Sequence, residues 1–137
     1  MAKDFTIKDG EQIRTRRCTI ASATVIEAGD LVTLDAGGLI IKAVAASTAV
    51  AYAVEASAVG DTVIEVTVGN DFTLTGTADA NFAVTDKGLE VDLVGTTTQL
   101  IDLGASTTDV LKVSIAEDAG TVGATTDVEV KINKPLF

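Results

Sequence analysis

Residues 31–44 read LVTLDAGGLIIKAV, and they carry the clearest local structural signal in the chain. Two apolar runs, Leu31–Asp35 and Leu39–Val44, flank the turn Ala36–Gly38. Because glycine accepts the positive φ that a tight turn requires, an Asp-Ala-Gly-Gly connection between apolar runs predicts a β-hairpin. We therefore expect a fold made of short strands joined by turns.

The composition extends this expectation to the whole chain. Threonine, valine and isoleucine number 20, 17 and 10, so 47 of the 137 residues are β-branched, which favours pleated sheets over helices. Glycine, threonine, serine and aspartate separate the apolar runs, a spacing typical of a compact β-barrel or β-sandwich. The further strands that we expect lie at residues 24–26, 61–68, 72–75, 88–94, 99–103, 110–116 and 127–133.

The alanine-rich segment 42–59 is the ambiguous part of the chain, because alanine is the best helix former. Ser47 and Thr48 interrupt the run, and residues 50–55 also fit a buried strand, so we expect a strand and keep a short helix as the alternative. Residues 21–137 are expected to form a single β domain. A weak resemblance between residues 53–68 and 115–132, whose strand cores align at an offset of 64, leaves two similar β units as an alternative organisation.

Charge divides the chain into a short basic start and an acidic body. The first 17 residues hold five bases against three acids, whereas residues 18–137 hold five bases against 17 acids. We expect residues 1–20 to form an extended arm that binds a partner protein, with a frayed terminus as the alternative. In a strand, Arg14 and Arg16 would point to one side and Arg17 to the other. The candidate partner-binding residues are Lys3, Phe5, Ile7, Lys8, Arg14, Arg16 and Arg17.

The same composition excludes several function classes. A net charge of −10 repels nucleic acid and anionic membranes. The chain has no histidine and a single cysteine, so it lacks the usual catalytic base, the usual zinc ligand sets and an internal disulfide. Its glycine turns match no phosphate-binding or dinucleotide motif. We expect no enzyme activity, cofactor or metal, although the acidic loop 71–86 leaves calcium open.

The two ends of the sequence complete this description. Charged residues interrupt the first stretch, so we expect no signal peptide, no membrane span and synthesis in the cytoplasm. At the other end, Leu136 and Phe137 follow the only proline, Pro135. These two residues either pack on their own core or form an oligomer contact, because aromatic anchors often carry interface energy.

Four short motifs resemble the capsid decoration, or cement, proteins of tailed bacteriophages. They are VIEAGDLVTL at 25–34, a Gly-Gly pair at 37–38, YAVEA at 52–56 and VGDTVIEV at 59–66. The resemblance implies a β-tulip-like module on the outer capsid surface of the virion. It also implies a homo-oligomer, with a trimer favoured over a dimer, that clamps neighbouring subunits of the major capsid protein. The alternative function is an acidic β-rich adhesive module that binds a polysaccharide or protein receptor.

Overall fold

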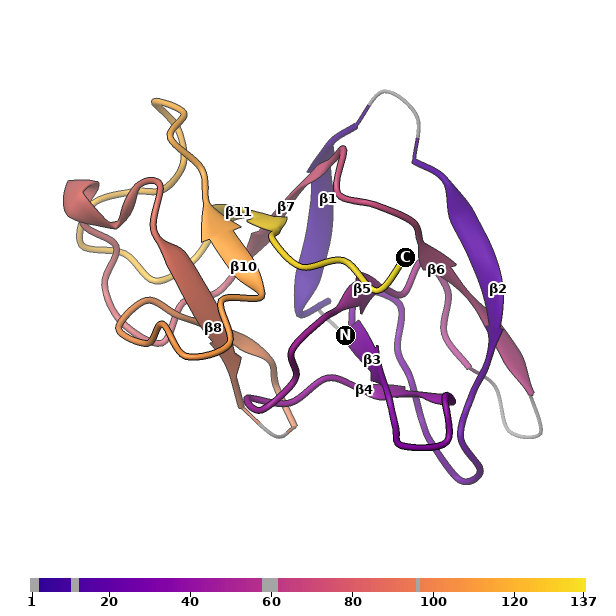
Figure 1. Ribbon diagram of the computed structural model, residues 1–137. Coiled ribbons are helices and arrows are strands. Elements are labelled where there is room, and N and C mark those ends of the chain that lie inside the picture. The colour runs from indigo at the N-terminus through magenta and orange to yellow at the C-terminus, as the bar shows by residue number, and fades with distance from the viewer. Residues whose placement is uncertain (1–2, 11–12, 58–61, 96) are drawn as a thin grey trace.

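The chain is an all-β protein in the computed structural model, which describes residues 3–10, 13–57, 62–95 and 97–137 (Figure 1). Every pairing between the described strands is antiparallel, and these strands form three open sheets and no closed barrel. The strands are β1 Phe5–Asp9, β2 Thr15–Thr19, β3 Leu31–Leu34, β4 Ile40–Lys42, β5 Ala51–Tyr52, β6 Val63–Thr67, β7 Thr73–Gly76, β8 Glu90–Val94, β9 Leu100–Asp102, β10 Leu111–Val113 and β11 Val128–Ile132.

The largest sheet has six strands in the order β1-β7-β11-β10-β8-β9. Its strands contribute ten of the 20 buried residues of the larger core cluster, including Leu93, Ile101 and Leu111, and the loop residue Phe82 packs with them, all at most 1% exposed. The 3-10 turn η1, Val84–Asp86, lies at one end of this part of the molecule (Figure 1). No helix in the described ranges has the length and apolar character to cross a membrane.

The two smaller sheets, β2-β6 and β4-β3-β5, surround a second core cluster that includes Ile26, Val32, Ile64 and Val66. They form the other end of the molecule, with β2 farthest from η1 (Figure 1). Alanine fills part of this core, since Ala51 and Ala53 are at most 2% exposed. The small side chains let the backbone of 50–53 lie fully inside the fold.

The N-terminal segment pairs within the chain instead of extending away from it as an arm. Strand β1 pairs with β7, and β2 pairs with β6, so the first two strands lie beside two strands that follow each other later in the chain. The close approach of β1 depends on Gly76. A Cβ there would lie 2.6 Å from a ring carbon of Phe5, which sits directly opposite in the register. Glycine at this position therefore makes room for the aromatic ring against the sheet.

The hairpin expected at residues 31–44 is confirmed, with β3 and β4 paired around the turn. The side chain of Asp35 stabilises it, because Oδ1 accepts hydrogen bonds from the N–H groups of Gly37 and Leu39, both at 2.9 Å. The strands expected at 61–68, 72–75, 88–94, 99–103, 110–116 and 127–133 correspond to β6 to β11, apart from residue 61, which lies outside the described residues.

The strand expected at residues 24–26 is wrong. The backbone of Ile26 forms two hydrogen bonds with Ser57 instead. Its N–H donates to the Ser57 Oγ at 2.9 Å, and its carbonyl accepts from the Ser57 N–H at 2.8 Å. Ala23 has a φ of 60°, which turns the chain away from an extended path. In the ambiguous segment, the described residues 42–57 contain β5 and no helix, which agrees with the strand interpretation.

Candidate protein-binding surface

The residues expected in the arm are distributed over several places in the fold. Phe5 is 0% exposed in the larger core, and Ile7 packs against that core from the side. Phe5 is therefore covered by its own chain, whereas Ile7 stays partly exposed. Lys3 is exposed and lies at the rim of a cavity of about 500 Å³.

Lys8 forms ion pairs with two carboxylates that lie more than 100 residues later in the sequence. Its Nζ lies 2.9 Å from Asp118 Oδ2 and 3.1 Å from Glu129 Oε2, and the side chain of Glu129 is only 6% exposed. The hydrogen bonds to Asp118 and Glu129 raise the pKa of Lys8, and the same contact lowers the pKa of Asp118. The ammonium therefore links β1 to β11, two strands away in the same sheet, and neutralises a nearly buried charge.

Strand β2 places its arginines on two sides, as the alternation of a strand requires. The guanidinium of Arg16 lies over the ring of Phe137, with Cζ 5.7 Å from the ring centroid, a distance at which a cation and an aromatic face attract each other. Arg17 points elsewhere, with Nη1 3.7 Å from Glu55 Oε1. Arg14 lies near Gly69, whose N–H donates to the carbonyl of Phe137 at 3.0 Å.

The C-terminal segment packs on its own chain. The N–H of Leu136 donates to the Val50 carbonyl at 3.0 Å, and the Leu136 side chain packs against the second core cluster. Phe137 is 37% exposed. Arg14, Arg16 and Phe137 thus form one exposed surface, which we call the Arg–Phe patch. It joins residues that the sequence analysis assigned to two separate candidate sites.

The surroundings of this patch contrast with the rest of the molecule. Residues 71–133 contain three lysines and 11 acidic residues, a net charge of −8 within the −10 of the whole chain. Most of the negative charge therefore belongs to the six-stranded part. The arginines of β2 lie at the opposite end (Figure 1).

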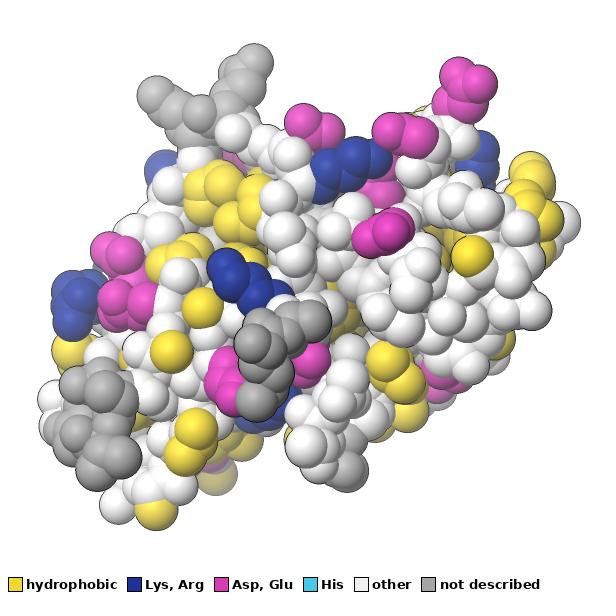
Figure 2. All heavy atoms as spheres, turned by 180° about the vertical axis from the view of Figure 1, so that it is seen from behind, with side chains coloured by type: hydrophobic (Ala, Val, Ile, Leu, Met, Phe, Trp, Pro, Cys, Tyr) yellow, Lys and Arg dark blue, Asp and Glu magenta, His cyan; other side chains and the backbone are white. Residues whose placement is uncertain are grey.

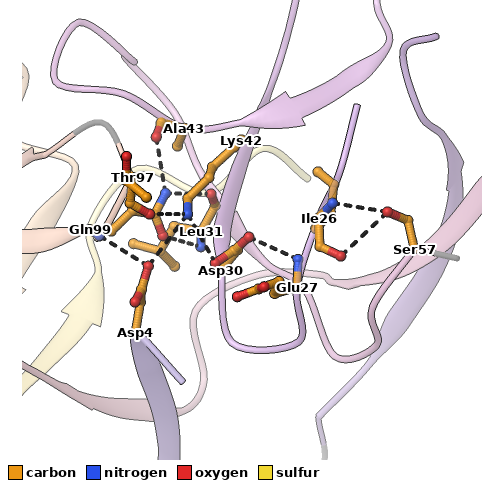
Figure 3. A network of polar contacts seen from close by, with 10 residues as sticks. All are labelled: Asp4, Ile26, Glu27, Asp30, Leu31, Lys42, Ala43, Ser57, Thr97 and Gln99. Carbon is orange, nitrogen blue, oxygen red and sulfur yellow. Dashed lines mark hydrogen bonds and ion pairs between the residues drawn. The ribbon is translucent and has the colours of Figure 1, made fainter. Parts of the chain in front are cut away.

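A second polar site joins the N-terminal segment to the β3-β4 sheet, and the sequence analysis did not identify it (Figure 3). Lys42 Nζ donates to the Thr97 carbonyl at 2.6 Å and lies 3.5 Å from both Asp4 Oδ2 and Asp30 Oδ1. Burial raises the pKa of Asp30, while the Glu27 N–H and the Lys42 charge act in the opposite direction. The ammonium holds three separate segments around the cavity.

Gln99 completes this network as a fully buried side chain. Its Oε1 accepts from the Leu31 N–H at 2.8 Å, and its Nε2 donates to the carbonyls of Leu31 and Ala43 at 2.8 and 3.0 Å. Its backbone N–H donates to Asp4 Oδ2 at 3.0 Å. The charged and polar groups at the cavity wall are thus bonded to one another, which favours a structural role for the network.

The Ala-Gly-Asp motif at 28–30 contributes to the same contact. Gly29 has a φ of 97°, and a Cβ there would lie 2.6 Å from the Lys3 Cβ and 2.7 Å from the Phe5 carbonyl. The Gly29 carbonyl accepts from the Phe5 N–H at 3.1 Å. The sequence signal for the network was therefore present in this motif, but the sequence alone does not show that the motif receives the N-terminal segment.

The acidic loop at 71–86 uses two of its carboxylates to order the backbone. Asp79 Oδ1 accepts from the Leu103 N–H at 3.2 Å, and Asp86 Oδ2 accepts from the Ala83 N–H at 2.8 Å. Among the residues that the structure describes, no three histidine, cysteine or acidic side chains gather in a way that would hold a metal ion. Burial, followed by the charge of Asp79, raises the pKa of Asp102.

Comparison of this chain with models of protein families, with curated proteins and with solved structures gives no match.

Proposed function

We propose that this chain is a non-enzymatic structural protein that binds the surface of another protein through the Arg–Phe patch. One observation carries the proposal: on a strongly acidic molecule, the exposed Arg16 of β2 lies over the exposed ring of Phe137, and the exposed Arg14, which precedes β2, lies near Gly69, which is bonded to Phe137. Arginine and aromatic side chains are enriched in protein interfaces and among the residues that dominate binding energy. A partner with an acidic or aromatic surface would complement the patch.

The resemblance to phage decoration proteins supplies the candidate partner, the major capsid protein. In this proposal, the chain is a β-tulip-like module on the outer capsid surface of the virion and stabilises the head by linking neighbouring subunits. Such stabilisation follows from linkage, because separating the subunits would require the loss of every contact that a bound copy makes. The N-terminal residues contribute through β2, since β1 lies inside the fold.

The test is co-sedimentation with native phage particles. The chain should sediment with the particles at a fixed copy number per capsid subunit. Arg16→Glu should weaken binding at least tenfold, which corresponds to about 1.4 kcal/mol. Lys131→Glu is the matched control: it makes the same charge change at an exposed site on β11, opposite Lys112.

Two results would contradict the proposal. Native particles that lack the chain would exclude the capsid as its partner. Equal binding by the Arg16→Glu and Lys131→Glu proteins would leave the capsid as a partner and exclude the Arg–Phe patch as the contact.

A further inference from the structure

The end of the molecule that carries η1 has an exposed aliphatic surface. The described part of the chain has eight large exposed hydrophobic residues, and four of them belong to this end. Figure 2 shows hydrophobic side chains projecting there, at the right-hand edge of the view from behind. The four residues, which we call the aliphatic end, are Val84, Leu89, Ile115 and Val122, with exposed fractions of 62%, 44%, 80% and 64%.

Two sets of contacts hold the segments of these residues side by side: one joins the segments of Leu89 and Ile115, and the other joins the segments of Val84 and Val122. The Gly88 N–H donates to the Val113 carbonyl at 3.0 Å, and a Cβ on Gly88 would lie 3.3 Å from Ile115 Cγ2, so Ile115 lies beside the residue that precedes Leu89. The loop that contains Val122 is held by a hydrogen bond from the Gly123 N–H to the Phe82 carbonyl at 2.9 Å. Exposed apolar groups that gather in this way mark an interaction site more often than single exposed residues do.

The charge around the aliphatic end restricts what can cover it. This end belongs to the part of the chain with a net charge of −8. The exposed Glu90 directly follows Leu89, and the exposed Glu117 is two residues after Ile115. A suitable partner surface must combine apolar contact with positive charge. The Arg–Phe patch has this combination, because it presents an exposed ring with Arg16 over it and the exposed Arg14 near the adjoining Gly69.

The two surfaces cannot meet within one molecule, because β2 and η1 lie at opposite ends of it (Figure 1). Contact between two aliphatic ends would bring together two strongly negative bodies, and contact between two Arg–Phe patches would oppose arginines. Like charges across an interface are unfavourable. A contact between unlike ends avoids both forms of repulsion.

We propose that copies of this chain associate head to tail, with the Arg–Phe patch of one copy on the aliphatic end of the next. Such an interface is heterologous, so it produces a closed ring if the rotation between copies closes and an open chain if it does not. The inference does not rest on the proposed function. A capsid subunit and a second copy would be alternative occupants of the Arg–Phe patch.

The experiment is sedimentation velocity of the purified full chain over a concentration series at low and high ionic strength. We expect species larger than the monomer, and weaker association at high salt, because ion pairs at the rim are screened. Ile115→Ser and Arg16→Gln should each weaken association about tenfold, since each removes a central group from one of the two surfaces. Val25→Ser and Lys131→Gln are the matched controls. Val25 is 73% exposed and lies at the cavity rim.

Mixing the two weakened variants separates this geometry from a symmetric dimer. The Ile115→Ser protein keeps an intact Arg–Phe patch, and the Arg16→Gln protein keeps an intact aliphatic end. Together they should form one-to-one pairs with an affinity close to that of a wild-type contact. The proposal is overturned if the wild-type chain stays monomeric at every concentration, if either variant associates like wild type, or if the mixture associates no better than its components.

Discussion

Replacing Gln99 with alanine is expected to lower the free energy of unfolding by about 3 kcal/mol. The Gln99 side chain is 0% exposed and forms three hydrogen bonds to backbone groups of the β3-β4 sheet, namely the Leu31 N–H, the Leu31 carbonyl and the Ala43 carbonyl. Alanine would leave the Leu31 N–H and the Ala43 carbonyl without this partner, whereas the Leu31 carbonyl would keep the hydrogen bond that it accepts from the Ala43 N–H at 2.9 Å. Each buried group that loses its partner costs about 1–3 kcal/mol.

The lower end of that range applies here, because the cavity beside Gln99 has a volume of about 500 Å³ and can admit water to the groups that are left. Two unpaired groups at about 1 kcal/mol each, and about 1 kcal/mol for the lost hydrogen bond to the Leu31 carbonyl, give the figure of about 3 kcal/mol. Gln99→Leu should cost at least as much, since leucine fills the space, excludes water and supplies no hydrogen bond. The adjacent Thr98→Ala is the control, because Thr98 is exposed.

Urea unfolding followed by the fluorescence of Tyr52 measures the effect. Tyr52 is the only tyrosine, the chain has no tryptophan, and the ring is 3% exposed. For a small domain with a urea m-value of about 1–3 kcal/mol/M, a loss of about 3 kcal/mol moves the midpoint by roughly 1–3 M. If the Gln99→Ala and Thr98→Ala proteins unfold at the same urea concentration, the network does not stabilise the fold as argued.

Three further predictions concern the packing and the charges of the fold. Phe5→Ala should cost about 3–5 kcal/mol, and Gly76→Ala should be far less harmful in the Phe5→Ala background than in the wild type, which a double-mutant cycle of unfolding free energies tests. Burial opposes ionisation of Asp92, but three backbone N–H bonds outweigh it and lower the pKa of its carboxyl. Its contribution to stability is therefore present above the ordinary carboxyl pKa of about 3.9 and is lost as the pH falls through the lower folded value, so Asp92→Asn should flatten the acid side of a melting-temperature profile. Lys8→Met should lower the melting temperature because Glu129 loses its cation, and adding Glu129→Gln should recover part of that loss.

Strands that depend on local signals could be predicted from the sequence, whereas contacts between distant segments could not. The hairpin at 31–44 follows from its turn residues, and Asp35 stabilises that turn through neighbours only two and four residues away. The segment 24–26 has an equally suitable composition, but a hydrogen bond to Ser57, 31 residues away, gives it an irregular backbone. Composition does not distinguish these two cases.

The same limit explains why the arm was expected to be free. Phe5, Ile7 and Lys8 look like the residues of a partner-binding strand, and they do form a strand, but its partner is β7 of the same chain. Gly76 makes room for Phe5, which precedes it by 71 residues, and Glu129 binds Lys8, which precedes it by 121 residues. Nothing near the N-terminus marks them as its partners.

The five bases at the start of the sequence therefore have different roles that depend on their chemistry. Lys8 is a compact cation that two carboxylates hold, and its site is already filled within the fold. Arg16 has a planar guanidinium that lies over the ring of Phe137 while part of the ring and Arg14 stay exposed, so its surface retains the capacity to bind. Substituting lysine for Arg16 would preserve the positive charge but remove the planar guanidinium. Binding that survives Arg16→Lys would then be driven by charge alone, and binding that is lost would identify the guanidinium over the ring as the recognition element.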